Sequence, residues 1–250
     1  MVTRDRAADG RRPSTESASG DDSFRLSRRE MLRGGVGGAA AGLFASAGVE
    51  LAAPLPSFAQ SKLTPDAALK ALMDGNRRFA AQRLTFYKED LRILKQKTAE
   101  KQEPFASVLS CADSRVPVEI IFDQSIGHVF VNRVAGNLAT AEIIASIEYG
   151  VAVLGTRVLM VLGHANCGAV KAAIAAKEVP GQISALYRGI RPAVDAAHGD
   201  LDATIKANAR IQAKLLNDSS PVIAAAVKDG KLKIVAAYYD LASGKVTLLA

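Results

Sequence analysis

Short, continuous runs of apolar residues recur along the chain and predict buried strands. The runs are rich in Val, Ile, Leu and aromatic residues, as strands covered on both faces are. The predicted strands cover residues 105–111, 128–133, 157–163 and 232–240, and a further strand at 245–250 follows the Ser243-Gly244 turn. The pattern therefore predicts one sheet built from these five segments.

Stretches with helical periodicity separate most of these strands. The expected helices cover about 139–155, 168–178, 182–197, 201–217 and 221–229. Apolar strands that alternate with helices predict a parallel sheet with helices on both faces. We therefore expect an α/β fold. Its central, mostly parallel β-sheet has about four parallel strands plus a C-terminal edge strand and is flanked by helices.

Two helices are expected before the first strand. Thr64 is suited to cap the first of them, and Pro65 takes its first helical position. Its apolar residues fall near one helical face, and they are Leu69, Leu72, Met73 and Phe79. A second, more charged helix is expected at about 88–99. We expect these N-terminal helices to be able to pack on a partner subunit.

The first sixty residues do not have the pattern of a folded domain. Residues 1–24 are rich in Ser, Gly, Asp and Arg, a composition typical of disorder. The pair Arg28-Arg29 then precedes an uncharged Gly/Ala-rich stretch at 34–49. This order resembles a twin-arginine export signal. A single membrane anchor is the alternative, but the stretch is short and glycine-rich for a membrane span.

A small-x-small cleavage site completes the resemblance to a signal, with Ser57 and Ala59 on either side of Phe58. We expect residues 1–59 to be a disordered region plus a cleavable signal that meets the export machinery transiently. Residues 60–250 are then a single folded domain. The expected location is the periplasm of a bacterium, with secretion as the second choice, and no stable membrane anchor is expected after cleavage.

Composition narrows the class of protein further. The chain has 250 residues, of which 49% are hydrophobic, and this is enough for one domain with a substantial core. The formal net charge is +7, but the Lys and Arg residues are scattered and do not interleave with aromatic residues. We therefore expect no nucleic-acid partner. Two cysteines cannot form a disulfide-dense scaffold.

Both cysteines follow a predicted strand. Cys111 comes after the first strand, and Cys167 comes after the third, three residues beyond His164. Ligand sites in open parallel sheets form beyond the carboxyl ends of the strands, where the strand order reverses. If the first and third strands are neighbours, two thiolates and an imidazole meet there. This donor set suits Zn²⁺ and leaves a fourth position for water or substrate.

Other interpretations of the same residues stay open at this point. An exported protein could join Cys111 to Cys167 in a disulfide, or both could be plain buried cysteines. His164 could be a hydrogen-bonded loop histidine, the role we assign to His128 and His198. The charged residues Asp113 and Arg115 could form a structural ion pair. Spacing alone does not decide between zinc and these alternatives.

Two motifs resemble those of the β-class carbonic anhydrases. They are "CADSR" at 111–115 and "HANCG" at 164–168, which match the Cys-x-Asp-x-Arg and His-x-x-Cys elements of that family. The likeness extends from "LMDGNRRFA" at 72–80 to "AAYYDLASGKV" at 236–246. One departure is Val134, where the family commonly has Asn, and we expect it to alter local packing rather than to abolish the chemistry.

The resemblance implies the reversible hydration of CO2 to bicarbonate and a proton. One Zn²⁺ per subunit would be held by Cys111, His164 and Cys167, and the attacking species would be zinc-bound hydroxide. The catalytic residues would be Asp113 and Arg115. Asp113 would accept a hydrogen bond from the hydroxide, and Arg115 would keep Asp113 ionised and oriented through a bidentate pair.

Further substrate-binding residues are implied by the same resemblance. The backbone N–H of Gly168 would meet a bicarbonate oxygen at a helix start. Gln102, Phe130 and Tyr149 match residues of the substrate cleft, some of which a neighbouring subunit supplies in the family. We therefore expect a homodimer or a dimer of dimers. For Phe130 and Tyr149, ordinary packing in the core is the better-supported interpretation from sequence alone.

Two other functions fit parts of the pattern. A hydrolase of CS2 or COS would have the same motifs, so only an assay separates it from a carbonic anhydrase. A non-enzymatic zinc-binding protein is disfavoured, because a structural zinc site needs neither the Asp113–Arg115 pair nor Gln102. Thiol counting and metal analysis would exclude a disulfide-bonded binding domain.

The resting state of the metal can also be predicted. Family members that close under control of bicarbonate hold it in a second pocket with a tryptophan three residues before the first cysteine. That position is Val108 here, and the chain has no Trp. Arg133 matches an arginine of that pocket, but without its partners a structural contact is the better interpretation. We expect Asp113 to pair with Arg115 near pH 7.5, rather than to bind zinc.

Overall fold

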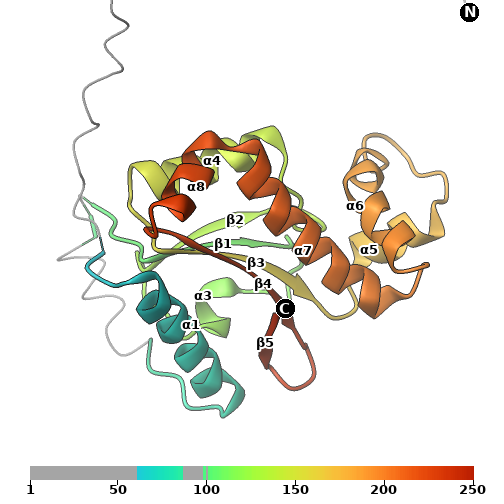
Figure 1. The fold of residues 1–250 in the computed structure, drawn as a ribbon. Coiled ribbons are helices and arrows are strands. Elements are labelled where there is room, and N and C mark those ends of the chain that lie inside the picture. The colour runs from blue at the N-terminus through green and yellow to red at the C-terminus, as the bar shows by residue number, and fades with distance from the viewer. Residues whose placement is uncertain (1–60, 87–97, 100) are drawn as a thin grey trace, which may run out of the picture. The chain divides into compact units, whose positions relative to one another are not determined.

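The computed structural model describes residues 61–86, 98–99 and 101–250 (Figure 1). The export signal predicted for residues 1–59 lies outside these residues, as does nearly all of the helix predicted at 88–99. Within the described part of the chain, no helix combines the length and apolarity that crossing a membrane requires.

Five strands form one sheet in the order β2-β1-β3-β4-β5. The strands are β1 (Ala106–Ser110), β2 (Val129–Arg133), β3 (Val158–His164), β4 (Lys233–Tyr239) and β5 (Val246–Leu249). The first four are parallel to their neighbours, and β5 runs antiparallel to β4 at one edge. The predicted α/β fold with four parallel strands and a C-terminal edge strand is confirmed.

Helices cover both faces of the sheet (Figure 1). On one face, α1 (Pro65–Ala80) and α3 (Val118–Ile121) bury Leu72 and Ile121 against the strands. The helices on the other face are α4 (Ala141–Ala152), α7 (Leu201–Ser219) and α8 (Pro221–Lys228). Every residue of β1 and β3 is buried, which explains why neither strand contains an Asp, Glu, Lys or Arg residue.

Local signals in the sequence account for several helix ends. The Thr64 side chain accepts a hydrogen bond from the Ala67 N–H at 3.2 Å, so it caps α1 as predicted. Asp200 caps α7 in the same way, by accepting from the Ala203 N–H at 2.7 Å. The four-residue helix α3 was not predicted, because a single turn has no periodicity to detect.

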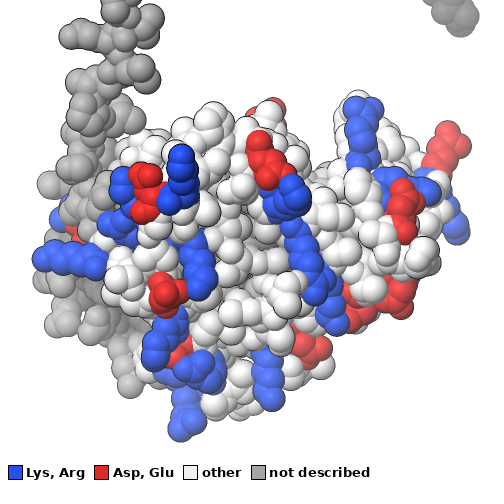
Figure 2. Space-filling model, in the orientation of Figure 1, with Lys and Arg blue, Asp and Glu red and all other residues white. Residues whose placement is uncertain are grey.

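Charged side chains are spread over the surface rather than gathered. Figure 2 shows the basic side chains of one face in separate groups, with acidic side chains among them. Along α7, Lys206 pairs with Asp202 and Lys214 pairs with Asp218, each four residues apart. Such exposed pairs contribute little to stability, typically less than about 1 kcal/mol each. On α7, the positive charges of these two lysines are therefore balanced by neighbouring aspartates.

The strand order reverses between β1 and β3. The chain leaves β1 towards β2 on one side and returns through α4 to β3 on the other side of β1. Helices α5 (Gly168–Ala175) and α6 (Ala185–Ala196) lie beyond the carboxyl ends of these strands (Figure 1). This reversal is the place where open α/β sheets form ligand sites.

Candidate metal centre

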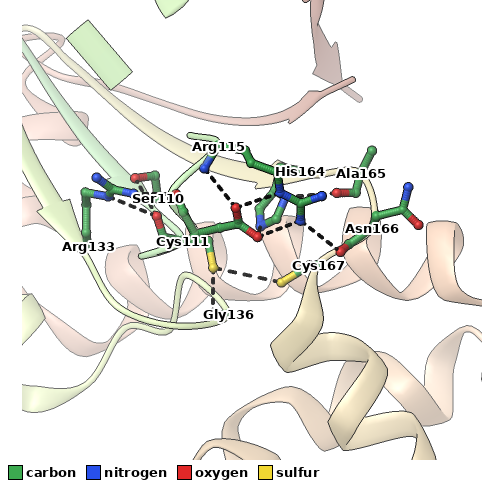
Figure 3. Close-up of polar contacts among 10 residues, drawn as sticks. Ser110, Cys111, Arg115, Arg133, Gly136, His164, Ala165, Asn166 and Cys167 are labelled. Atoms are coloured by element: carbon green, nitrogen blue, oxygen red, sulfur yellow. Dashed lines mark hydrogen bonds and ion pairs between the residues drawn. The ribbon is translucent and has the colours of Figure 1, made fainter. Parts of the chain in front are cut away.

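The two cysteines and His164 meet beyond the carboxyl ends of β1 and β3. Cys111 directly follows β1, His164 is the last residue of β3, and Cys167 caps the N-terminus of α5. Their ligand atoms lie within 4.8 Å of one another, and all three side chains are buried (Figure 3). We predicted this meeting for the case that the first and third predicted strands are neighbours, and β1 and β3 are indeed paired.

The spacing of the two sulfur atoms fits a tetrahedral metal ion. The Sγ atoms of Cys111 and Cys167 are 3.9 Å apart, and both cysteines are free. Two sulfur ligands at ~2.3 Å from one tetrahedral zinc ion lie roughly 3.8 Å from each other. The two sulfurs therefore have the separation that a shared zinc ion requires.

One of the two ring nitrogens of His164 makes no hydrogen bond. Its Nδ1 lies 2.9 Å from the carbonyl oxygen of Ala165, so Nδ1 carries the proton and donates it to that oxygen. The other nitrogen, Nε2, is buried and has no hydrogen-bond partner. A metal-bound histidine has this arrangement, because the second nitrogen fixes the ring and its tautomer. The lone pair of Nε2 thus completes a Cys–His–Cys donor set that fits Zn²⁺.

The environment of the sulfurs favours one thiolate even without a metal. A hydrogen bond from the Cys167 thiol lowers the pKa of Cys111 despite burial, and His164 and the Gly136 N–H add to this effect. The same shared proton raises the pKa of Cys167, and burial adds to that rise. Binding of a metal ion displaces the remaining proton, as thiolate ligands require.

Asp113 and Arg115 form a bidentate pair at the edge of this cluster. Arg115 donates from Nε to Oδ1 of Asp113 at 2.9 Å and from Nη2 to Oδ2 at 2.7 Å. The Arg115 backbone N–H also donates to Oδ1, at 2.9 Å. These bonds hold the pKa of Asp113 well below its usual range, although burial acts in the opposite direction. The carboxylate is ionised, and its Oδ2 lies 3.9 Å from Nε2 of His164.

Arg133, the last residue of β2, donates hydrogen bonds to the backbone of the Cys-x-Asp-x-Arg motif at 111–115. Its Nε donates to the carbonyl oxygen of Cys111 at 3.0 Å, and its Nη2 donates to that of Asp113 at 2.6 Å (Figure 3). The guanidinium is therefore engaged with the chain itself. This agrees with the structural interpretation of Arg133, although the partners are carbonyl groups rather than an acidic side chain.

The remaining cleft residues do not join the metal cluster within one chain. Gln102 precedes β1 whereas Cys111 follows it, and the five residues of this strand span roughly 17 Å. Phe130 pairs with Ser107 near the start of β1, and its ring lies 6.2 Å from that of Tyr149. If these residues line a cleft beside the metal, a neighbouring subunit must bring them there.

The expectation that Tyr149 is an ordinary core residue is wrong. Its side chain is 45% exposed, on the helix that packs beside the edge strand β2, and Phe130 is only half-buried. Helical periodicity predicted α4 but could not show which of its faces lies against the sheet. An exposed tyrosine beside the edge strand of the described sheet is a feature that contact with another subunit would explain.

Gly168 is the first residue of α5 and faces open space. A Cβ atom added there would meet no other atom within 4 Å, so the N-terminus of α5 is accessible from outside. The two histidines given structural roles lie elsewhere. His128 packs its ring at 6.3 Å from that of Phe105, and His198 lies in the turn after α6.

One contact of the centre was not foreseen. The backbone N–H of Gly136 donates to Sγ of Cys111 at 3.3 Å. Gly136 belongs to the loop that connects β2 to α4, and its φ angle is +79°, which favours glycine. The sequence "AGN" after a strand signals such a turn, but it does not tell where the N–H points.

Comparison with known proteins identifies the family. A family model described as "Carbonic anhydrase" matches residues 106–246. The curated protein "Carbonic anhydrase 2" of Mycobacterium tuberculosis is 36% identical over 192 residues, which cover 74% of this chain and 92% of that protein. The chain belongs to the carbonic anhydrase family. The "Carbonic anhydrase" of Mycolicibacterium smegmatis is 37% identical, over 74% of this chain and 93% of its own.

Solved structures place the fold within the β-class of this family. A Coccomyxa β-carbonic anhydrase in complex with acetazolamide superposes with a TM-score of 0.58 at 29% identity, covering 72% of this chain and 86% of its own. A tetrameric β-carbonic anhydrase of Sordaria macrospora has the same fold, with a TM-score of 0.59 at 22% identity over 73% of this chain and 96% of its own. The family, the fold and the class of enzyme predicted from the two motifs are confirmed.

Proposed function

We propose that the protein catalyses the reversible hydration of CO2 to bicarbonate and a proton, with one Zn²⁺ per chain. The observation that best supports this is the buried Cys–His–Cys donor set with its free Nε2, directly beside an ionised Asp113. A purely structural zinc site has four protein ligands. Three protein ligands beside an oriented carboxylate are instead what a catalytic site needs.

The residues of the chain have separate tasks in this mechanism. When bound, Zn²⁺ lowers the pKa of a water molecule towards ~7, so that a nucleophile exists at neutral pH. Asp113 accepts a hydrogen bond from the attacking oxygen and thereby directs a lone pair of that oxygen towards the carbon of CO2. Arg115 prevents the carboxylate from rotating, because both of its oxygens are bonded.

The product carries a negative charge that the site can also accommodate. The start of α5 provides backbone N–H groups, and the N–H of the exposed residue Gly168 is the one we assign to a bicarbonate oxygen. Arg115 adds positive charge at the rim, because half of its side chain is exposed. Neither group is a ligand of the metal, so both can act on product release without changing the metal site.

CO2 is favoured over CS2 and COS by the names of the two mycobacterial relatives, both of which are carbonic anhydrases. The test is to supply each gas separately to the purified protein and to follow proton release for CO2 and sulfide release for CS2 and COS. CO2 hydration should exceed the other two rates by orders of magnitude. A faster hydrolysis of CS2 or COS would replace the proposed substrate while leaving the metal chemistry in place.

We also propose that the chain assembles as a homodimer or a dimer of dimers. The open edge of β2, the exposed Tyr149 and the half-buried Phe130 support this assembly, and the Sordaria macrospora relative is described as tetrameric. Gln102 would reach a metal site only across such an interface. Sedimentation of the purified protein should give at least a dimer, and a monomer at micromolar concentration would contradict the proposal.

Export through the twin-arginine route remains part of the proposal and rests on the sequence alone. Residues 1–59 would be the signal, and residues 60–250 the mature catalytic domain. This route carries folded proteins, so the thiolates could bind zinc before they meet an oxidising compartment. Replacing both Arg28 and Arg29 with Lys should leave the precursor in the cytoplasm, and unchanged export would contradict this route.

A further inference from the structure

The loop at 134–140, between β2 and α4, approaches the sulfur of Cys111 with a backbone donor. The N–H of Gly136 lies 3.3 Å from Sγ. Gly136 and Asn137 both have left-handed φ angles, +79° and +46°. A Cβ at Gly136 would also come within 2.9 Å of Cδ1 of Ile190. Glycine therefore suits this position best, because a side chain would combine a strained backbone with a close contact to Ile190.

Two side chains of α7 hold the same loop from the opposite side. Asn208 donates from Nδ2 to the carbonyl oxygen of Gly136 at 2.9 Å. Gln212, one helical turn later, accepts at Oε1 from the N–H of Ala139 at 2.9 Å. The N–H of Gly136 thus donates to the Cys111 sulfur, and its carbonyl oxygen accepts from Asn208.

The side-chain amides of Asn208 and Gln212 also form a hydrogen bond with each other. Nε2 of Gln212 donates to Oδ1 of Asn208 at 3.2 Å and to the carbonyl oxygen of Gly189 at 3.2 Å. Asn208 is 0% exposed and Gln212 is 2% exposed. Buried amides are costly unless they are hydrogen-bonded, and these contacts leave little freedom for either side chain to turn. The pair is a rigid support rather than a solvated surface feature.

We propose that Asn208 and Gln212 are positioning residues of the metal centre. They hold the loop so that the Gly136 N–H donates to the Cys111 thiolate, which stabilises the negative charge on the sulfur and fixes its direction. The inference rests on the proposed function in one respect, that Cys111 binds the metal. Partners that orient a ligand in this way commonly change metal affinity by about 10–100-fold when they are removed.

The first test compares zinc affinities, measured by competition with a chelator. Asn208→Leu removes the bond to Gly136 while keeping the branching and the number of heavy atoms of the side chain, and Gln212→Leu removes the bond to Ala139. Each should raise the Kd for zinc by about 10–100-fold. Thr204→Val is the matched control, because Thr204 is fully buried on the same helix but bonds only to the carbonyl of Asp200. Its zinc Kd should stay within about twofold of wild type.

The outcomes separate this inference from the proposed function. If the wild-type protein binds zinc and both Leu variants bind it with the wild-type Kd, the positioning role is wrong while the metal site stands. If all three variants weaken zinc binding equally, the effect is a general loss of stability and the role is again wrong. Failure of the wild-type protein to bind zinc would remove the metal site and this inference with it.

A second measurement needs no variant and covers the case in which the Leu variants fail to fold. The wild-type protein is loaded with ¹¹³Cd and labelled with ¹⁵N. A hydrogen bond from Gly136 to a metal-bound sulfur should give a scalar coupling between its amide proton and the cadmium nucleus. Absence of that coupling in cadmium-loaded wild-type protein would overturn the proposal.

Discussion

Arg115 donates a hydrogen bond to each carboxylate oxygen of Asp113, and Oδ2 of that carboxylate lies 3.9 Å from the free Nε2 of His164. The acidic side chain is therefore next to the metal position but turned towards the arginine. In this orientation it can accept a hydrogen bond from a molecule at the fourth metal position. A rotation of the same side chain would bring it onto the metal itself.

The first prediction concerns Asp113→Asn, which keeps the shape of the side chain but removes its charge. Zinc should stay bound at one per chain, because Asp113 is not part of the Cys–His–Cys set. CO2 hydration should fall by about a hundredfold or more, as expected when one preorganised catalytic partner is lost. Stopped-flow proton release and metal analysis of the same sample check both parts. A wild-type rate would show that the pair is only structural.

The second prediction concerns the geometry of the arginine. Arg115→Lys keeps the positive charge but cannot form two parallel hydrogen bonds. The rate should fall by roughly tenfold to a hundredfold, because the carboxylate is no longer held in place. Arg115→Ala should have at least as large an effect, because it frees Asp113 to rotate onto the metal. Equal activity of the Lys variant and the wild type would mean that charge alone is needed.

The third prediction concerns the resting state near pH 7.5. Asp113 should stay paired with Arg115, and bicarbonate should inhibit only as a product, without cooperativity. Val108 stands where a controlled member would have Trp, and Arg133 is bonded to two backbone carbonyls. A crystal structure at this pH decides the matter. An Asp113 oxygen at ~2.0 Å from zinc would contradict the prediction, as would sigmoidal inhibition by bicarbonate.

The fourth prediction concerns acid stability and a residue outside the metal centre. Asp123 is buried, which by itself would raise its pKa. Hydrogen bonds from Arg78 and from the N–H groups of Thr85 and Phe86 outweigh burial and lower the pKa. A depressed folded-state pKa stabilises the fold above the unfolded value of ~3.9, and this contribution is lost as the pH falls through the folded value.

Asp123→Asn tests this at constant shape, and Asn tolerates the left-handed backbone found there, with φ of +48°. The variant should be less stable than wild type by about 1–3 kcal/mol at pH 7, since it removes charge-assisted hydrogen bonds to a buried carboxylate and the ionic partner of Arg78, which is itself partly exposed. The difference should shrink steadily below pH 4. Urea unfolding of both proteins at each pH measures it, and a difference that is constant down to pH 3 would contradict the assigned cause.

Much of the fold could be predicted because its signals are local. The strands β1 and β3 are buried on both faces, so each is a mostly apolar run without an Asp, Glu, Lys or Arg residue. Thr64 and Pro65 mark the start of α1 by their own chemistry. The metal ligands could be predicted because each stands at or within three residues of the carboxyl end of one of these strands, where the switch in strand order brings them together.

The rest depends on contacts that the sequence does not reveal. Gly136 and Asn208 are 72 positions apart, and their hydrogen bond depends on how α7 lies over the loop. The two carbonyl groups bound by Arg133 are equally invisible in the sequence, because every residue has one. The exposure of Tyr149 was not predicted for a related reason. The sequence shows that a helix has an apolar face, but not whether that face packs on the same chain or on another one.

The central claim is that catalysis requires zinc held by Cys111, His164 and Cys167. The most direct measurement removes the metal with a chelator and then restores zinc stepwise while CO2 hydration is followed. Activity should be absent without zinc and should rise linearly until one zinc ion per chain is bound, and Cys111→Ser should neither bind zinc tightly nor recover. Full activity in zinc-free protein, or an active protein with a quantitative disulfide between Cys111 and Cys167, would contradict the account.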